Sequence, residues 1–230
     1  MPLLGTGLLV VWNDIAPENE ADFETWYRGE HLAERVGLPG FRRGRRYRAL
    51  NSDTTPRFGA IYETETPEIL ASDRYLARLD DPTPMTARMI ARFRNTHRTV
   101  LRVAASVGRG VGGALAVVRP RARDGQTDQL GKWIGDTALP ALIEAPGVVG
   151  AHFASIETAL TRSDNAEGRA RGAPDQLDNQ LLLIEAIGAD EAKRAVATVL
   201  TDDALTANGA LTKPTVGLYV MIHNVSSLDL

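Results

Sequence analysis

Glu30 and His31 are the adjacent residues of this chain whose types most directly suggest chemistry. They lie in residues 23–50, FETWYRGEHLAERVGLPGFRRGRRYRAL. A histidine side chain titrates near neutral pH, so His31 can act as a general acid or base. We predict that His31 is catalytic. The alternative is that it only caps or packs near the end of its helix.

The helix that carries this pair is predicted to begin near Pro17 and to end before Gly37. With successive residues about 100° apart around the axis, His31 lies about 80° from Phe23, on the flank of an aromatic face, and Leu32 lies opposite. The residues of that face are Phe23, Trp26, Tyr27 and Glu30. Glu30 is about 100° from His31 on the same wheel, so a direct pair is not assured.

An arginine-rich strand follows in residues 41–50. Alternation puts Arg42, Arg46 and Arg48 on one face, and Arg43, Arg45 and Tyr47 on the other. One or two guanidiniums in a cleft could hold a carboxylate or phenolate, although a solvated strand end with ion pairs is the favoured interpretation for the group. The predicted ligand-binding residues are Trp26, Tyr27, Glu30, Phe41, Arg43, Arg45 and Tyr47.

The other histidines are His97, His152 and His223, each on or beside a predicted strand. Any of them could bind a haem iron or another metal. None has a paired-ligand spacing such as HxH or HExxH, so a structural role is favoured for each. We predict no metal site and no cofactor.

Composition excludes several classes of function. The 230 residues carry a formal net charge of −3, which favours neither nucleic acid nor an anionic membrane as partner. The absence of cysteine excludes disulfides, thiolate metal sites and a cysteine nucleophile. The N-terminus lacks a basic signal-peptide region, and no apolar run approaches the ~20 residues that span a bilayer. We predict a cytoplasmic protein.

A diverged copy of the first helix and the turn after it returns 107 residues later. The recurring pairs are Trp26 and Trp133, Leu32 and Leu139, Pro39 and Pro146, and Gly40 and Gly147. Both tryptophans are predicted to pack helices against sheets. Glu30 and His31 are replaced by Thr137 and Ala138. The copy therefore keeps residues that a fold needs and loses the candidate chemistry.

The elements occur twice in the order βαββαβ, which is the ferredoxin-like unit. Strands are predicted at residues 7–12, 41–50, 57–63, 96–103, 114–118, 147–156, 181–187 and 215–223, with helices between them. A helical region from residue 66 is predicted to break at Pro82 and Pro84. Residues 104–113 are predicted to be a glycine-rich connection, and residues 157–179 a long irregular loop. That loop accounts for the offset of 122 between Glu63 and Glu185.

Two such units predict the fold. Residues 1–107 and 112–230 would each form a four-stranded antiparallel sheet with two helices on one face. The bare sheet faces must be covered, and they can cover each other. We therefore predict an α+β protein in which two tandem ferredoxin-like units form one intrachain pseudo-dimeric α+β barrel.

The motif WY-x-x-EHL followed by PGFRRGRRY resembles the EthD-like members of the dimeric α+β barrel superfamily. The resemblance is best over residues 8–103, with residues 112–224 as a diverged relative. It implies a barrel with a ligand cleft between sheet and helices. Other branches of the superfamily include monooxygenases, polyketide cyclases, muconolactone isomerases and haem proteins, so the resemblance leaves the reaction open.

Three functions remain. The first is a small-molecule enzyme that acts on an apolar or aromatic metabolite, by cofactor-free isomerisation, dehydration or cyclisation, or by oxygenation, with His31 as acid or base. The second is a non-catalytic barrel that binds a ligand or serves as a scaffold. The third is a haem-binding barrel. A fused pseudo-dimer is expected to be a monomer or a homodimer.

Overall fold

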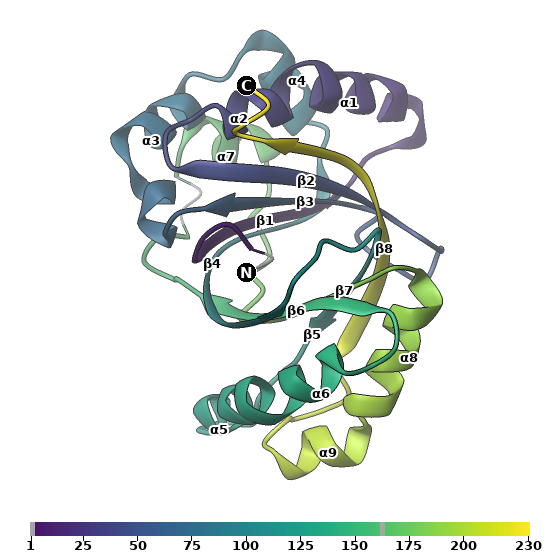
Figure 1. Ribbon diagram of the computed structural model, residues 1–230. Coiled ribbons are helices and arrows are strands. Elements are labelled where there is room, and N and C mark those ends of the chain that lie inside the picture. Colours follow the sequence, from purple (N-terminus) through teal and green to yellow (C-terminus); the bar gives the residue numbers. More distant parts are fainter. Residues whose placement is uncertain (1–2, 162–163) are drawn as a thin grey trace.

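The computed structural model describes residues 3–161 and 164–230, and this part of the chain forms a closed antiparallel β-barrel of eight strands flanked by helices (Figure 1). The order around the barrel is β1-β3-β2-β8-β5-β7-β6-β4. The strands are β1 (Gly7–Asp14), β2 (Phe41–Ala49), β3 (Phe58–Thr64), β4 (Arg94–Gly108), β5 (Ala114–Arg119), β6 (Val148–Ile156), β7 (Gln180–Ala186) and β8 (Thr215–Ser226). The predicted α+β barrel is confirmed.

The barrel consists of two four-stranded sheets, one from each half of the chain. The first half, residues 7–108, gives the order β4-β1-β3-β2, and the second half, residues 114–226, gives β8-β5-β7-β6. The halves join where β2 pairs with β8 and where β4 pairs with β6. Both joints are antiparallel, so closure leaves the described barrel without a free sheet edge.

Strand β4 corrects one prediction. Residues 104–108 are not part of a connection, because β4 continues through them to Gly108. Its beginning pairs with β1 and its end pairs with β6, with a register shift between Val103 and Ala105. Small side chains suit this crossing from one sheet to the other, since a bulge bends the strand.

Helices cover the outer face of each sheet. The α-helices are α1 (Glu20–Trp26), α2 (Leu32–Val36), α3 (Asp73–Asp80), α4 (Pro84–Ile90), α5 (Thr127–Trp133), α6 (Leu139–Ile143), α7 (Ala166–Arg171), α8 (Ala189–Val199) and α9 (Asp202–Ala207). In Figure 1, α1 to α4 and α7 lie above the barrel, and α5, α6, α8 and α9 lie below it. The predicted proline break is confirmed, because α3 ends at Asp80 and α4 begins at Pro84. No helix of the described residues is long and apolar enough to cross a bilayer.

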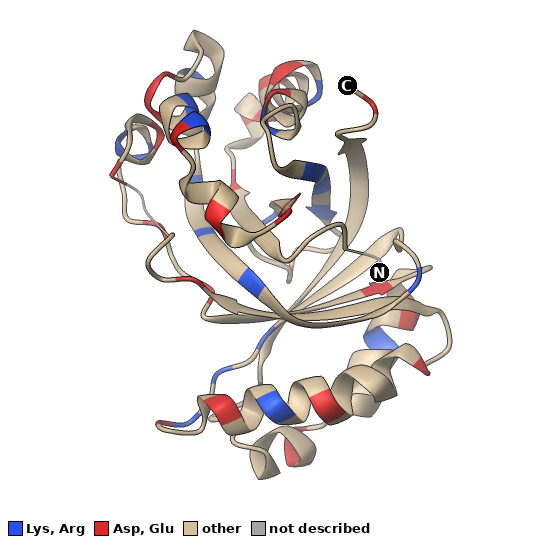
Figure 2. Cartoon of the chain, turned by 60° about the vertical axis from the view of Figure 1, so that its left-hand side comes forward, with Lys and Arg blue, Asp and Glu red and all other residues tan. Residues whose placement is uncertain are grey.

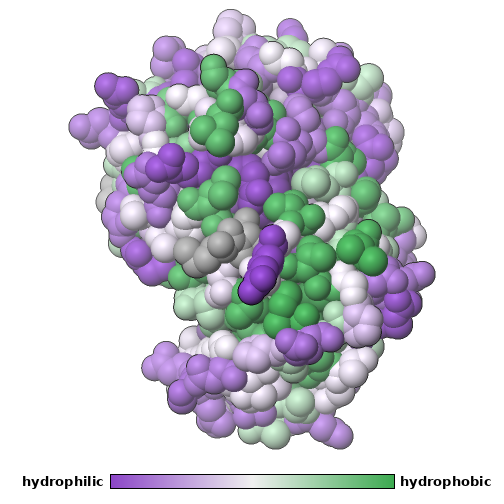
Figure 3. Space-filling view, in the orientation of Figure 1, coloured by the Kyte–Doolittle hydropathy of each residue, from purple (hydrophilic) through white to green (hydrophobic). Residues whose placement is uncertain are grey.

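Three apolar clusters form the core. One lies between the first-half sheet and its helices, one occupies the same place in the second half, and one fills the barrel interior. Leu8, Trp12 and Tyr219 belong to the interior cluster and are fully buried. Apolar residues also gather at the surface near the middle of the face in Figure 3.

The two halves have the same element boundaries at the predicted offset. The elements α1, α2 and β2 recur 107 residues later as α5, α6 and β6, each with the same length and the same boundaries after the offset. The conserved turn has a physical cause, because Gly40 and Gly147 adopt φ of 86° and 84°, a region that favours glycine. Beyond the long insertion, β3 and β7 match at an offset of 122.

A π-helical turn interrupts the first helix and corrects its predicted faces. Residues Tyr27–His31 form this turn, and Ile134–Ala138 form its counterpart. A π turn accommodates one extra residue, so the residues after it are rotated back by about 100° relative to a continuous α-helix. Leu32 is therefore fully buried rather than opposite the aromatic face, and His31 turns inward.

The insertion between β6 and β7 corrects the predicted irregular loop. It contains α7, whose N-cap residue Asn165 accepts a hydrogen bond from the Gly168 amide at 2.9 Å. The Ala166 amide donates to Asp80 Oδ1 of α3 at 2.9 Å. A helix from the second half therefore lies among the helices of the first half (Figure 1).

Candidate functional site

His31 ends the first π-helical turn and is 7% exposed. Its ring stacks on Trp26 with ring centres 4.2 Å apart and meets Tyr27 edge-on at 5.2 Å. The distance from His31 Nδ1 to Glu34 Oε2 is 3.9 Å, too long for a hydrogen bond. Nδ1 thus has no hydrogen-bond partner among the residues that the structure describes.

The surroundings of His31 keep its imidazole neutral. Burial lowers the pKa of His31 well below its usual value, and the positive charges of Arg35, Arg46 and Arg78 lower the pKa further. The nearby Glu34 does not reverse this direction, because its carboxylate lies beyond hydrogen-bonding distance and also faces Arg78 at 3.4 Å. A neutral imidazole keeps one ring nitrogen that can accept a proton.

A largely enclosed cavity of about 30 Å³ lies between the first-half sheet and its helices, and His31 lines it. A water molecule needs ~10–15 Å³ of such volume, so this conformation has room for water but not for a metabolite. The apolar and aromatic lining is Leu9, Val11, Tyr27, Tyr62, Tyr75, Ile90 and Phe93. The charged lining beside His31 is Arg35, Arg98, Glu167 and Arg171.

Tyr27 and Tyr62 line this cavity as neutral hydrogen-bonding groups. Burial raises the pKa of Tyr27, and burial with the neighbouring Tyr27 raises the pKa of Tyr62 well above its usual value. The Tyr62 hydroxyl has no hydrogen-bond partner within residues 3–161 and 164–230. Arg98 Nη2 donates to the Tyr75 hydroxyl at 2.9 Å. The cavity thus places donors on an otherwise apolar wall.

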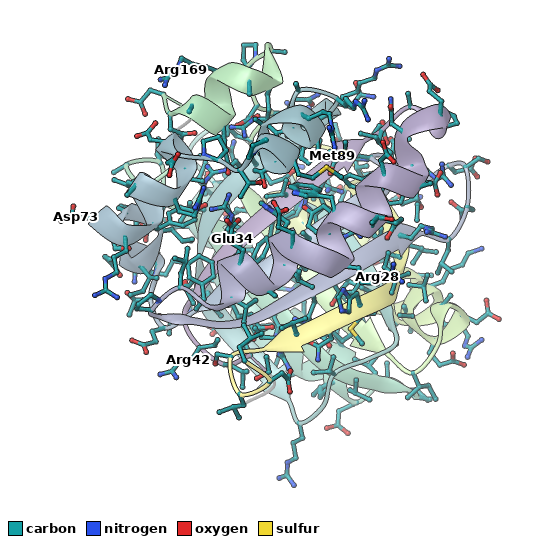
Figure 4. All side chains as sticks on the ribbon, turned by 90° about the horizontal axis from the view of Figure 1, so that it is seen from above. Arg28, Glu34, Arg42, Asp73, Met89 and Arg169 are labelled. Carbon is teal, nitrogen blue, oxygen red and sulfur yellow. The ribbon has the colours of Figure 1, made fainter. Side chains whose placement is uncertain are left out.

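Helix α7 closes the cavity with a buried ion pair. Arg35 of α2 donates through Nη2 to Glu167 of α7, and the two side chains are 3% and 7% exposed. Arg171 and Asp175 form a second, bidentate pair with both distances 2.7 Å. Figure 4 looks down on this layer: Glu34 and Met89 lie between the helices, and Asp73, Arg42 and Arg169 lie at the rim.

Two of the predicted ligand-binding residues attach helices to each other. Trp26 Nε1 donates to Thr86 Oγ1 at 3.0 Å, and Thr86 Oγ1 donates to Glu30 Oε1 at 3.1 Å. Thr83 of α4 also donates to Glu30. The carboxylate of Glu30 is directed to α4 and does not line the cavity, so its predicted place as a polar handle in the cleft needs correction.

Tyr27 and Phe41 remain beside the candidate site. Tyr27 lines the cavity. Phe41 is 2% exposed and packs against Tyr62 and Tyr75, with ring centres 6.2 and 5.5 Å away. Phe41 therefore supports the wall rather than forming it.

Arg43, Arg45 and Tyr47 lie on the other face of β2 and do not share a cleft with His31. Tyr47 belongs to the cluster inside the barrel. Arg43 makes a bidentate pair with Glu63 at 2.8 and 2.9 Å. The run of blue on the strand beside the C-terminal strand in Figure 2 is β2. The predicted single cleft needs correction, because β2 is buried on both faces and alternation sends these residues inward.

The charges inside the barrel form a network between the halves. Arg45, fully buried, contacts Glu63 at 3.0 Å and Glu185 at 2.7 Å. His152 corresponds to Arg45 at the offset of 107, and its Nε2 lies 3.3 Å from Glu185 Oε1. Burial alone would raise the pKa of Glu185, but the His152 hydrogen bond and the Arg45 charge lower the pKa to about 2. The favoured prediction placed these arginines in solvent with ion pairs. Arg43 and Arg45 do form ion pairs, but both are buried, so the predicted exposure was wrong.

The arginines of the opposite face are also paired. Arg46 is 1% exposed, lies over the Tyr27 ring at 3.8 Å and donates to Glu24 at 2.8 Å. Arg48 faces Glu24 at 3.4 Å. Burying a guanidinium between aromatic rings and a carboxylate offsets its desolvation, so these contacts hold α1 on the sheet.

The three remaining histidines do not fit a haem. His152 is fully buried beside Ser106, whose Oγ lies 2.8 Å from Nδ1. His97 lies 3.4 Å from Asp178 beside a depression of about 280 Å³. His223 lines neither this depression nor the cavity beside His31. Within that part of the chain no group of three or more His, Asp or Glu is arranged to hold a metal ion.

A larger open groove of about 550 Å³ lies between α8, α9 and β8. Its floor is apolar, with Val196, Leu200 and Val216, and its charged residues stand at an exposed rim. It contains neither a histidine nor a tyrosine. We assign the candidate chemistry to the small, largely enclosed cavity, because buried polar groups without partners mark a site more strongly than volume does.

Sequence reasoning missed Arg35, Tyr62, Arg98 and Glu167. Arg35 is four residues after His31, a helical spacing that could have pointed to it. Tyr62 is on the same strand face as the buried Phe58 and Ala60. Glu167 had no sequence signal, because it lies in the insertion that has no counterpart in the first half.

Comparisons with known proteins bear on the fold alone. No family model and no curated protein matches the sequence. A structure of an anthrone oxidase-like protein matches with a TM-score of 0.65 and 13% identity, over 97% of this chain and 94% of that chain. A structure of a proposed monooxygenase from Fusobacterium nucleatum matches with a TM-score of 0.60 and 9% identity, over 97% of this chain and 96% of that chain. Another proposed monooxygenase, from Lactobacillus acidophilus, matches with a TM-score of 0.60 and 9% identity, over 96% of this chain and 97% of that chain.

Proposed function

We propose that this protein is a small-molecule enzyme of the EthD-like type, with its active site in the largely enclosed cavity of the first half. Its substrate is an aromatic or otherwise apolar compound with a carbonyl or phenolic oxygen. His31 is the acid or base, and the chemistry needs no cofactor. The tandem organisation, with residues 1–107 and 112–230 as the two units of one barrel, is part of the same proposal, as is a monomeric or homodimeric state.

The observation that carries this proposal is the neutral, unpartnered imidazole of His31 at a cavity that also contains guanidinium groups. Nδ1 has no hydrogen-bond partner among the described residues, and burial beside Arg35 lowers the pKa of His31. A structural histidine would be expected to have both ring nitrogens satisfied. Unsatisfied groups with shifted pKa values gather at functional sites.

The arrangement suits proton transfer next to a carbonyl group. The neutral imidazole can accept a proton from an activated carbon or hydroxyl of the substrate. The enolate or phenolate that results would be stabilised by a guanidinium such as Arg35. Because the pKa of His31 is low, its imidazolium would return the proton readily, which completes an isomerisation, dehydration or cyclisation. Reaction of the enolate with dioxygen would instead give oxygenation.

The fold neighbours support the same class of chemistry. The protein with the TM-score of 0.65 is named as anthrone oxidase-like. Anthrone has a methylene group made acidic by the adjacent rings and carbonyl, and its oxidation begins with loss of that proton. Anthrone is therefore a reasoned first substrate to offer, although the identity of 13% brings only the fold.

A non-catalytic ligand-binding barrel is the second candidate. The observation that favours it is the volume of the cavity, about 30 Å³, which is too small for such a substrate while α7 is in place. An enzyme requires α7 to move, since the other walls are strands and packed helices. The two candidates therefore differ in whether the bound compound exchanges a proton.

Deuterium exchange of the anthrone methylene group, followed by NMR in D₂O, tests the proposal. Wild-type protein is expected to accelerate the exchange, and His31→Ala is expected to lose about 100-fold or more of that acceleration. His223→Ala, a histidine change outside the cavity, is the matched control and is expected to stay within about twofold of wild type. Acceleration by His31→Ala within about twofold of wild type would remove the acid–base role.

A further inference from the structure

We propose that Glu167 occupies the place of an anionic group of the substrate on Arg35, so that the site selects aromatic anions, whose binding displaces α7. This inference rests on the proposed function, because it concerns the same cavity. It adds the charge of the substrate and the event that opens the site. Neither follows from the fold, since Glu167 lies in an insertion that the first half lacks.

The contact between Arg35 and Glu167 is buried and joins the two halves of the chain. Arg35 and Glu167 are 2% and 6% exposed and lie 132 residues apart in sequence. Arg35 Nη1 has no hydrogen-bond partner in residues 3–161 and 164–230, so its guanidinium can donate to a further oxygen. Carboxylates bind guanidinium groups best through two parallel hydrogen bonds. A carboxylate from a ligand could therefore use both terminal nitrogens of Arg35.

The lining of the cavity carries more positive than negative charge. Three guanidiniums line the cavity, those of Arg35, Arg98 and Arg171, and Glu167 is the one carboxylate among the described lining residues. Arg171 is paired with Asp175. If Glu167 left, a positive charge would remain buried at Arg35, at a large cost in free energy. An anion from a ligand would remove that cost, whereas a neutral ligand of the same shape, such as anthrone, would bear it and bind more weakly.

Glu34 does not replace Glu167. Its Oε2 is 4.0 Å from Arg35 Nη2, its side chain is 20% exposed, and Arg78 lies 3.4 Å away. Burial raises the pKa of Glu167 in spite of three nearby arginines. The carboxylate on α7 therefore sits in a strongly desolvated position, which a ligand anion with an aromatic body could fill while burying more apolar area.

Helix α7 is attached to the first half by a buried ion pair and by exposed polar contacts. The Arg35–Glu167 pair is the buried ion pair between α7 and the first half among the described contacts. Two further polar contacts of α7 with that half, from Ala166 and Arg169, go to Asp80, whose side chain is 58% exposed. Exposed attachments contribute little to stability. An anion that competes for Arg35 would therefore release much of the hold on α7.

The aromatic side chains of the cavity indicate the shape of the uncharged part of the ligand. Tyr27, Tyr62, Tyr75 and Phe93 line the cavity. Aromatic walls favour a planar aromatic ligand by stacking and edge contacts. The combination of this wall with Arg35 specifies an aromatic carboxylate or phenolate.

Titration calorimetry with 1-naphthoate and with neutral 1-naphthamide tests the inference. Wild-type protein is expected to bind naphthoate about tenfold or more tightly than naphthamide, because only the anion can take the place of Glu167 on Arg35. Glu167→Gln is expected to tighten naphthoate binding by about tenfold or more and to keep this preference, because opening no longer breaks the ion pair. Glu34→Gln is the matched control, because its carboxylate lies 4.0 Å from Arg35 and outside the cavity, and it should change naphthoate binding by less than about threefold.

Three outcomes would overturn the inference: no preference for naphthoate over naphthamide in the wild type, which would make α7 a simple steric cover; no gain with naphthoate in Glu167→Gln; and the same gain in Glu34→Gln. Should Glu167→Gln not fold, the double variant Arg35→Met with Glu167→Met keeps the charges balanced. It is expected to bind the two ligands within about twofold of each other. A preference for naphthoate that survived there would also overturn the inference.

The result is separable from the proposed function. Adding His31→Ala to Glu167→Gln is expected to leave the naphthoate preference in place, since His31 does not hold the anion. If the preference appears but no anthrone exchange occurs in any variant, the inference stands and the enzyme proposal falls. If exchange depends on His31 but the preference is absent, the enzyme proposal stands and the inference falls.

Discussion

The two sheet–helix layers of this protein share one framework but differ in their interiors. Corresponding positions are polar in the first half and apolar in the second. Both contain a helix with a π-helical turn, packed on a strand through the same turn geometry. At corresponding positions the first half has Tyr27, His31, Arg35 and Tyr62, and the second half has Ile134, Ala138, Leu142 and Ile184. All eight residues are buried. The second half shows that this framework needs none of the four polar groups.

The difference has an energetic meaning. A buried hydroxyl or imidazole without a partner costs about 1–3 kcal/mol, and a buried charge costs more. The second half avoids these costs with an apolar cluster that includes Ile134, Leu142 and Ile184. The first half accepts them and needs a carboxylate from an inserted helix to balance Arg35. Such a departure from a feasible apolar core is expected where function requires it.

The largest effect is expected when the charge of the first half is moved to the second. Leu142→Arg puts a guanidinium at the position that corresponds to Arg35, in a fully buried place within the apolar cluster of the second half. We expect a loss of about 4 kcal/mol or more in the free energy of unfolding, or failure to fold. Urea denaturation followed by circular dichroism measures it.

Ala141→Arg is the control for that substitution, because Ala141 is the neighbouring exposed residue of α6. It is expected to change stability by less than about 0.5 kcal/mol. If Leu142→Arg were as mild as Ala141→Arg, the second layer would tolerate charge, and the contrast between the two interiors would lose its meaning.

Much of the fold could be predicted from the sequence because it depends on repeated local signals. Trp133 packs against the second-half cluster and Trp26 is buried in the first, as predicted. Gly40 and Gly147 mark the turn in both halves, since their positive φ needs glycine. Strand alternation also divided the arginines of β2 correctly, with Arg43 and Arg45 on the face opposite Arg46.

A smaller effect is expected from making the first layer resemble the second. Arg35→Leu alone leaves Glu167 buried without its partner and is expected to cost about 3–5 kcal/mol. Arg35→Leu together with Glu167→Leu removes both charges and is expected to be neutral or stabilising by about 1–3 kcal/mol. A double-mutant cycle on unfolding free energies gives the coupling directly.

Arg42 and Glu65 provide the surface counterpart for that cycle. Their side chains are 48% and 47% exposed, and Nη2 lies 2.6 Å from Oε1. The coupling between Arg42→Leu and Glu65→Leu is expected to be below about 1 kcal/mol. Equal coupling for the two pairs would show that the Arg35–Glu167 contact is not a strongly desolvated one.

The site was less predictable than the fold for three physical reasons. The π-helical turn changes which residues after Tyr27 face the sheet, and a regular helical wheel cannot show it. Both faces of β2 are buried in a closed barrel, so an inward arginine and a site arginine have the same sequence pattern. Glu167 reaches Arg35 from the other half, a contact that no local pattern encodes.

The smallest effect concerns the titration of His31, which Ala138 replaces in the second half. The pKa of His31 is lowered in the folded protein, so between that value and about 6.5 the unfolded chain binds more protons. Stability is therefore lost as the pH falls below about 6.5, by about 1 kcal/mol for each pH unit. His31→Ala has no such proton to lose. We expect the difference in unfolding free energy between wild type and His31→Ala to shift against wild type by about that amount between pH 6.5 and pH 5.5. A constant difference over this range would mean that His31 accepts a proton as easily in the folded protein as in the unfolded chain. The imidazole would then be no more costly to charge in this layer than in water, and the polar interior of the first half would not be the desolvated one that its contacts describe.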